Sequence, residues 1–153
     1  MDRTAVIGQI ADNMHWLKRE TQNHLARTYD AMELSPAQVE LLKLISCKGP
    51  LSHKELAAEA RLTPGAITQL LDGLETANCI VREDSPKDRR VSIISISPTG
   101  NEKLQAAISY YRSLLMRAFD ALDDDELLAY SHAQQKLIDW HKANCPDTQA
   151  KKE

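Results

Sequence analysis

Two adjoining segments decide the fold of this chain, Leu51-Ser-His-Lys-Glu-Leu-Ala57 and Leu62-Thr-Pro-Gly-Ala-Ile-Thr-Gln-Leu-Leu-Asp-Gly-Leu-Glu75. In the first segment, Ser52 and Glu55 have the spacing of a capping box, in which each side chain satisfies a backbone N–H near the other residue. We therefore expect a short helix that begins here and runs to about Arg61. The second segment follows after a tight turn and predicts another helix.

Thr63 and Pro64 mark the start of this second helix. Threonine is a good N-cap, and the N–H that proline lacks would have no partner at the first helical position. The apolar residues then recur at helical spacing and predict one core-facing stripe, namely Ile67, Leu70, Leu71 and Leu74. The other face begins with small and hydrogen-bonding residues, namely Gly65, Ala66, Thr68 and Gln69. No acid precedes Asp72 in this helix, so its first turns can approach a polyanion closely.

A hairpin follows the helix pair. Asn78 tolerates the left-handed conformation at a helix end. Residues 79–83 and 91–96 read as two short strands, and Val91, Ile93 and Ile96 are expected on one face. The order helix, turn, helix, hairpin is that of a winged helix-turn-helix, a module that reads double-stranded DNA.

The loop of this hairpin is basic, with Lys87, Arg89 and Arg90 close to its tip. An arginine on a thin hairpin can enter the minor groove of DNA, where a narrow groove has the strongest negative potential. We expect Asp88 to orient one of the guanidinium groups. The alternative for such a loop is a solvated polar hairpin tip.

These segments resemble the MarR (multiple antibiotic resistance regulator) family of bacterial transcription factors. The resemblance covers residues 51–57, 62–75, 80–90 and 96–100, and includes the signatures Asp88-x-Arg90 and Ser97-x-x-Gly100. It implies a winged helix-turn-helix whose first and last helices interlock with those of a second subunit. It further implies a repressor whose DNA spacing changes when a ligand binds between the helical dimer and the winged module.

The chain departs from the usual family pattern at four positions. Gln69 and Gly73 stand where many members have arginine, and Arg61 and Asn78 stand where many have glycine. The loss of two cations weakens the electrostatic attraction to DNA. Gln69 can instead form a bidentate hydrogen bond with an adenine.

Composition restricts the way in which DNA can be bound. The chain has 153 residues, of which 42% are hydrophobic and 27% charged, and this suits one compact unit. A formal net charge of -3 and a pI near 6.0 exclude binding by bulk positive charge, so any affinity must come from local placement. The N-terminal residues lack the pattern of a secretory signal, and no apolar run has the length of a membrane span, so we expect a cytoplasmic protein.

The residues outside the helix pair and hairpin predict four more helices. The first covers about residues 2–30, and Ser35-Pro-Ala-Gln38 caps the next, which ends near Gly49. A long helix follows Gly100, and a last one covers residues 127–144 with acids at positions 123–126 in front of it. The apolar stripes of the first and the long helix are Val6, Ile10, Met14, Leu17 and Leu25, and Leu104, Ile108, Tyr111, Leu115, Ala118 and Leu122.

The fold class expected is thus mainly α, a winged helix-turn-helix with a small β-hairpin wing and terminal helices that form a dimerisation region. Residues 35–100 are expected to bind DNA, residues 1–34 and 101–145 to form the helical dimerisation region, and residues 146–153 a flexible tail. The apolar stripes of the terminal helices are larger than one subunit can cover, and a second copy of the chain is the simplest partner to bury them. A two-fold homodimer implies a palindromic operator, whereas the alternative is a monomer with an all-helical core.

Other binding sites are less well marked. The family resemblance suggests His15, Trp16, Tyr110 and Tyr111 as walls of a pocket for a small aromatic or lipophilic effector, although tyrosines at helical spacing more often pack in a core or an interface. Five scattered histidines do not predict a metal site, and no cofactor is expected.

The three cysteines, Cys47, Cys79 and Cys145, are too far apart in the sequence for a zinc ribbon or a disulfide framework. We expect Cys79 to be a small core residue rather than a sensor.

No enzyme class is indicated, because the chain contains no nucleophile elbow, phosphate-binding loop, zinc-protease pair or dinucleotide fingerprint. The function expected is a dimeric, sequence-specific DNA-binding transcriptional regulator, a repressor released by a small-molecule ligand. The alternative is a winged-helix protein-interaction module that does not bind DNA tightly. The effector, the operator and the regulated genes do not follow from the residues.

Overall fold

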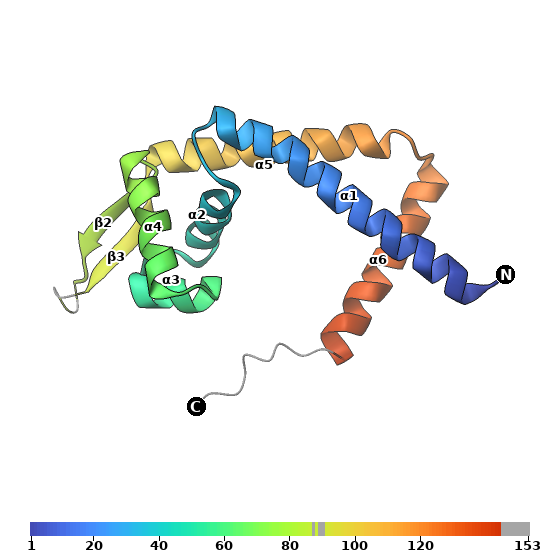
Figure 1. Ribbon diagram of the computed structural model, residues 1–153, viewed down its shortest axis with the longest axis horizontal. Coiled ribbons are helices and arrows are strands. Elements are labelled where there is room, and N and C mark those ends of the chain that lie inside the picture. Colours follow the sequence, from blue (N-terminus) through green and yellow to red (C-terminus); the bar gives the residue numbers. More distant parts are fainter. Residues whose placement is uncertain (87, 89–90, 145–153) are drawn as a thin grey trace. The chain divides into compact units, whose positions relative to one another are not determined.

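The computed structural model describes residues 1–86, 88 and 91–144 (Figure 1). The chain divides into two compact units, Met1–Tyr111 and Arg112–Glu153. The elements run in the order α1 (Arg3–Ala31), α2 (Pro36–Lys48), β1 (Leu51–Ser52), α3 (His53–Ala60), α4 (Pro64–Thr76), β2 (Ile80–Asp84), β3 (Ser92–Ile96), α5 (Pro98–Phe119) and α6 (Asp124–Asn144). The mainly α winged helix-turn-helix expected from the sequence is confirmed, while Cys145 and the expected tail lie outside the described residues.

The caps predicted from sequence set the starts of the two helices of the helix-turn-helix. At α3, the Ser52 hydroxyl accepts a hydrogen bond from the Glu55 N–H at 3.3 Å, and the Glu55 carboxylate accepts one from the Ser52 N–H at 2.8 Å. The Ser52 hydroxyl also donates to this carboxylate. The two hydrogen bonds that the carboxylate accepts, from the hydroxyl and from the N–H of Ser52, lower the pKa of Glu55 because they favour its charged form. At α4, the Thr63 hydroxyl accepts from the Ala66 N–H at 3.3 Å.

The apolar face of α4 forms the centre of the core of the first unit. Ile67, Leu71 and Leu74 are completely buried, and Leu70 packs against them while partly buried. The other fully buried large side chains come from the surrounding helices and strands, and include Val39, Leu42, Ile45, Leu56, Cys79, Ile94 and Leu104. The stripe expected from helical spacing is therefore the one that the fold buries.

The wing belongs to a three-stranded antiparallel sheet with the strand order β1-β3-β2. Leu51 pairs with Ile94, and Ile80 pairs with Ile96. The two-residue strand β1 was not predicted, because two residues give no alternating pattern to detect. The prediction that Val91, Ile93 and Ile96 share one face was wrong: Ile94 and Ile96 contact the core, whereas Val91 is 38% exposed. Residues 93 and 96 cannot share a face, since side chains alternate with a period of two.

Three non-glycine residues of this unit adopt the left-handed conformation, namely Glu33 with a φ of 58° and one residue at the end of each of α3 and α4. Arg61 ends α3 with a φ of 54°, and Asn78 follows α4 with a φ of 54°. Arg61 and Asn78 are the two positions at which the chain departs from the glycine of the family pattern that it resembles. The fold keeps the conformation that favours glycine, and a side chain with a Cβ costs on the order of 1–2 kcal/mol there for most residues, less for asparagine.

A glycine in the middle of α4 has a tertiary cause. A Cβ at Gly73 would overlap the side-chain amide of Gln38 in α2. The carbonyl oxygen of this amide accepts a hydrogen bond from the Ser35 N–H at 2.8 Å and so completes the N-terminal capping box of α2. Gly73 thus lets α2 and its cap lie close to α4.

The Ser97-x-x-Gly100 signature anchors the start of α5. The Ser97 hydroxyl donates to the Asn78 carbonyl at 2.6 Å and accepts from the Gly100 N–H at 2.9 Å. The Ser97 N–H donates to the Cys79 carbonyl at 3.0 Å, and a Cβ at Gly100 would overlap the same carbonyl oxygen. The motif therefore holds the first turn of α5 against the backbone that joins α4 to β2.

The terminal helices differ slightly from their predicted bounds. The long helix α5 ends at Phe119, before Leu122, and α6 begins at Asp124, earlier than the predicted residue 127. The earlier start follows from a reciprocal cap, in which the Asp123 carboxylate accepts from the Glu126 N–H at 2.9 Å and the Glu126 carboxylate accepts from the Asp123 N–H at 3.0 Å. Among the described residues, no helix combines the length and apolar character needed to span a bilayer.

We expect Gly100→Ala to destabilise the protein by about 1–3 kcal/mol or more, because the added methyl group must displace backbone rather than a flexible side chain. The measurement is urea unfolding at fixed protein concentration. Gly65→Ala is the matched control, since no atom outside its chain neighbours and the adjacent helix backbone lies within 4 Å of its Cβ position, and it should leave stability equal or slightly higher. An unchanged midpoint for Gly100→Ala would contradict the close contact with Cys79.

Candidate DNA-binding surface

The exposed face of α4 presents the residues predicted to contact DNA. Thr63, Gly65, Thr68 and Gln69 are exposed, and Ala66 is half-buried. Because Ile67 and Leu71 hold the opposite face in the core, these side chains must face outward. The surface of the first two turns is therefore small, polar and free of acids up to Asp72, as a helix entering a major groove requires.

The wing is described only in part. Its predicted cations, Lys87, Arg89 and Arg90, lie outside the described residues. Around them the loop is closed by two hydrogen bonds, from the Ser85 N–H to the Val91 carbonyl at 2.8 Å and from the Val91 N–H to the Asp88 carbonyl at 2.9 Å. Asp88 is exposed at this turn, and its orienting role stays a prediction.

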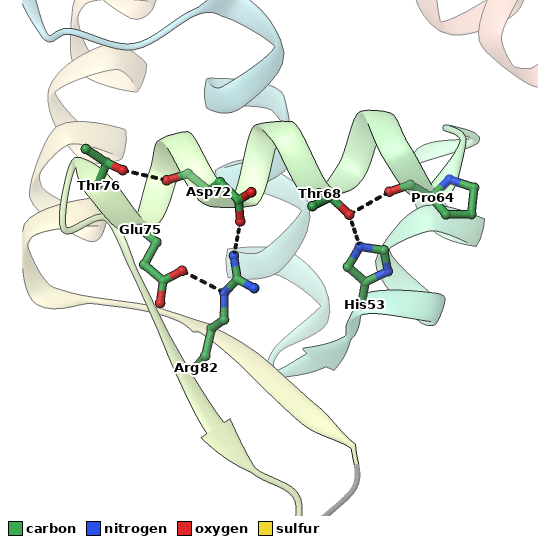
Figure 2. A network of polar contacts seen from close by, with 7 residues as sticks. All are labelled: His53, Pro64, Thr68, Asp72, Glu75, Thr76 and Arg82. Atoms are coloured by element: carbon green, nitrogen blue, oxygen red, sulfur yellow. Dashed lines mark hydrogen bonds and ion pairs between the residues drawn. The ribbon is translucent and has the colours of Figure 1, made fainter.

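Thr68 makes contacts within the protein that the sequence did not indicate (Figure 2). Its hydroxyl donates to the Pro64 carbonyl at 2.9 Å, and its oxygen lies 3.0 Å from Nε2 of His53 in α3. The Thr68 hydroxyl, which lies on the face predicted to approach DNA, thus already has two partners within the protein. His53 is a site residue that sequence reasoning missed, because fifteen residues separate it from Thr68 and only the fold brings the two together.

Arg82 of β2 is a second missed residue, and it links the wing to α4 (Figure 2). Its Nη2 donates to the Asp72 carboxylate at 2.7 Å. Its Nε lies 3.0 Å from the Glu75 carboxylate as an ion pair, although this contact does not have hydrogen-bond geometry. A signal was present in the sequence: two acids one turn apart on a helix, followed by an arginine in the next strand.

This arrangement changes the electrostatics of the surface more than its stability. The side chains of Arg82, Asp72 and Glu75 are 30%, 61% and 52% exposed, and exposed ion pairs of this kind contribute only about 0–1 kcal/mol to stability. Their larger effect is on an approaching polyanion, because the positive charge of Arg82 compensates the negative charges of the two carboxylates on α4, the recognition helix. The repulsion that these acids would exert on phosphate is thereby reduced.

The proposed effector residues do not line either of the cavities described in the structure. One groove of about 480 Å³ is formed by residues of α2, α3 and the turn after α3, namely Ala37, Glu40, Leu41, Lys43, Leu44, Cys47, Glu59, Ala60 and Leu62. A smaller one of about 310 Å³ lies along α1, at Glu20, Asn23, His24, Ala26 and Arg27. The four predicted residues, His15, Trp16, Tyr110 and Tyr111, border neither. Their role stays a prediction.

The cysteines with described environments have different surroundings. Cys79 is completely buried, and burial raises the pKa of its thiol, an effect that the positive charge of Lys103 partly offsets. A buried thiol with a raised pKa holds little thiolate and behaves as the small core residue that the sequence predicted. Cys47 is exposed. Among the described residues, no three metal-binding side chains come together.

We expect Arg82→Met to weaken binding to any DNA duplex by roughly tenfold at low salt, since Asp72 and Glu75 then repel the phosphates without compensation. Fluorescence anisotropy with a labelled duplex measures the effect. Arg112→Met makes the same charge change on α5 and serves as the control. Addition of Asp72→Asn and Glu75→Gln to Arg82→Met should restore binding, and a failure to do so would contradict the electrostatic explanation.

Comparison with known proteins identifies a family. Residues 34–92 match the model of the MarR family. The transcriptional repressor MdtR of Bacillus subtilis (strain 168) is 26% identical over 132 residues, which cover 86% of this chain and 85% of MdtR. The uncharacterised regulator YkoM of the same organism is 28% identical over 108 residues, or 71% of this chain and 70% of YkoM.

Solved structures agree with this assignment. The crystal structure of YusO from Bacillus subtilis has a TM-score of 0.81 at 25% identity, and the match covers 91% of this chain and 99% of YusO. A MepR variant from S. aureus, bound to an oligodeoxyribonucleotide, shares the fold with a TM-score of 0.69 at 16% identity, over 85% of this chain and 96% of MepR. The winged helix-turn-helix described above, the match of residues 34–92 to the family model and these relatives together show that the chain is similar to the transcriptional regulators of the MarR family.

Proposed function

We propose that this regulator binds a palindromic operator as a homodimer in the cytoplasm, represses transcription there, and is released by a small aromatic or lipophilic effector. The observation that carries the DNA-binding part is the exposed face of α4, which is free of acids in its first two turns and whose later acids are paired with Arg82. Repression is supported by MdtR, which is named a transcriptional repressor.

The dimer is proposed from apolar surface that a single chain leaves uncovered. On α1, Val6, Ile10, Met14 and Leu17 are between 38% and 62% exposed. On α6 no residue is buried, and its large exposed apolar side chains are Leu127, Leu128, Tyr130, Leu137, Ile138 and Trp140. Apolar helix faces of this extent mark an interaction surface. A second copy can cover such faces through a two-fold arrangement.

In the proposed complex, α4 lies in the major groove and the loop around residues 87–90 lies in the adjacent minor groove. The DNA-contacting set is Thr63, Gly65, Ala66, Thr68, Gln69, Lys87, Arg89 and Arg90, with Asp88 orienting an arginine. A dimer presents two such surfaces, which we expect to contact half-sites about one or two helical turns apart. The effector is assigned to His15, Trp16, Tyr110 and Tyr111 only by the family resemblance.

The function is tested by selection from a random pool of 40-base-pair duplexes with the wild-type protein. We expect enrichment of a sequence with two-fold symmetry, and an affinity for it that falls steeply with salt, with a slope of about -0.9 per phosphate neutralised. If no sequence is enriched and the protein shows no salt-dependent DNA binding, the alternative of a protein-interaction module is favoured instead.

For the dimer, we expect analytical ultracentrifugation to give twice the subunit mass of 17.2 kDa at micromolar concentration. Leu137→Asp should shift the protein to monomer, because it places a charge on an apolar side chain that is 63% exposed in the single chain. Binding to the selected duplex should fall at least tenfold, since each half-site alone is weak. Lys136→Asp introduces the same carboxylate at a charged position of α6 and should leave the dimer intact. A wild-type protein that sediments only as monomer would refute this interface.

Gln69 is the residue of this surface best suited to read a base edge, because its amide can donate to and accept from an adenine at once. Gln69→Ala should reduce the preference for the selected duplex over a scrambled one by roughly 1–3 kcal/mol, with little change in binding to the scrambled duplex. Competition binding with both duplexes measures this difference, and Gln105→Ala on α5 is the control. If Gln69→Ala keeps the full preference, specificity comes from DNA shape or from the wing.

A further inference from the structure

The direction of the contact between His53 and Thr68 depends on where the Thr68 hydroxyl directs its proton. The Thr68 hydroxyl has one proton, and it donates that proton to the Pro64 carbonyl at 2.9 Å. Its oxygen can therefore only accept from His53, whose Nε2 lies 3.0 Å away. This arrangement requires a proton on Nε2 of His53, and the ring, the hydroxyl and the carbonyl then form a relay from α3 into the first turn of α4 (Figure 2).

A second threonine of α4 shows which part of this relay is special. The Thr76 hydroxyl donates to the Asp72 carbonyl at 2.9 Å, in the same way that Thr68 donates to Pro64. A hydroxyl bonded to the carbonyl one turn earlier is a common local arrangement in helices. What distinguishes Thr68 is the imidazole from the neighbouring helix, which ties its position to α3.

The location of the relay connects it to base recognition. His53 is the first residue of α3, and Thr68 is the residue before Gln69 on the exposed face of α4. In a helix-turn-helix, the first helix crosses the DNA backbone while the second enters the groove. A bidentate contact with a base requires its donor and acceptor to be placed closely, so the rotation of α4 relative to α3 affects specificity.

We propose that His53 is a positioning residue for DNA recognition, which fixes Thr68 and with it the first two turns of α4 against the start of α3. The inference rests on the proposed function and adds a determinant of its specificity. It also revises the role of Thr68, which acts through His53 rather than by donating its hydroxyl proton to phosphate.

A double-mutant cycle with His53→Leu and Thr68→Val tests the proposal on the full-length protein. The probes are the duplex selected by the wild type from the random pool and a scrambled duplex of equal length. We expect each single variant to lose about tenfold in affinity for the selected duplex and less than twofold for the scrambled one. The double variant should be no weaker than either single variant, because both remove the same interaction.

His53→Gln should recover most of the specificity, since its amide can donate to the Thr68 oxygen. Thr76→Val is the matched control, because it removes the equivalent intrahelical hydrogen bond without an imidazole partner, and it should show no coupling with His53→Leu. Urea unfolding of every variant separates positioning from stability, as a purely structural role would lower the midpoint and weaken binding to both duplexes equally. Long-range ¹H–¹⁵N spectra of the free protein should show the proton of His53 on Nε2.

Three results would overturn the inference: additive losses in the cycle, equal losses on the two duplexes, or a His53 ring without a proton on Nε2. If the wild type enriches a sequence and the cycle is additive, only the role of His53 fails. If the wild type enriches no sequence, the proposed function fails and this inference fails with it.

Discussion

The burial of one face of α4 is the constraint on which the rest of this structure depends. Ile67, Leu71 and Leu74 are completely enclosed by the helices and strands around them. Because a helix has only one orientation that buries such a stripe, Thr68 and Gln69 are held on the opposite, exposed face. The same helix therefore supplies the residues that stabilise the module, on its buried face, and the residues available to DNA, on its exposed face.

Polar contacts refine the orientation that this apolar packing sets. His53 reaches the first half of α4 from α3, and Arg82 reaches its second half from β2. Each contact is worth little as stability at an exposed site. Together they connect α4 to α3 and to β2, so a change in either of these elements has a physical route to the DNA-binding surface.

The first turn of α5 is joined to the winged module through backbone. Ser97 bonds to the carbonyls of Asn78 and Cys79, and Gly100 allows α5 to lie against the second of these. At Gly100 the two backbones meet without a side chain between them, and the short Ser97 hydroxyl bridges them beside it. The start of the long helix is therefore held rigidly against the segment that links the recognition helix to the wing.

Sequence alone determined the parts of this protein that depend on neighbours along the chain. The caps at Ser52 and Thr63 and the buried stripe of α4 follow from short, regular spacings, and they predicted the helix-turn-helix and its exposed face. Contacts between distant segments were decided only by the tertiary structure: Ile94 as the core residue of β3, Arg82 beside the acids of α4, and His53 on Thr68. Helix caps and apolar periodicity involve residues a few positions apart, so they can be recognised in the sequence. The contacts between distant residues form only because packing of the core brings separate elements together.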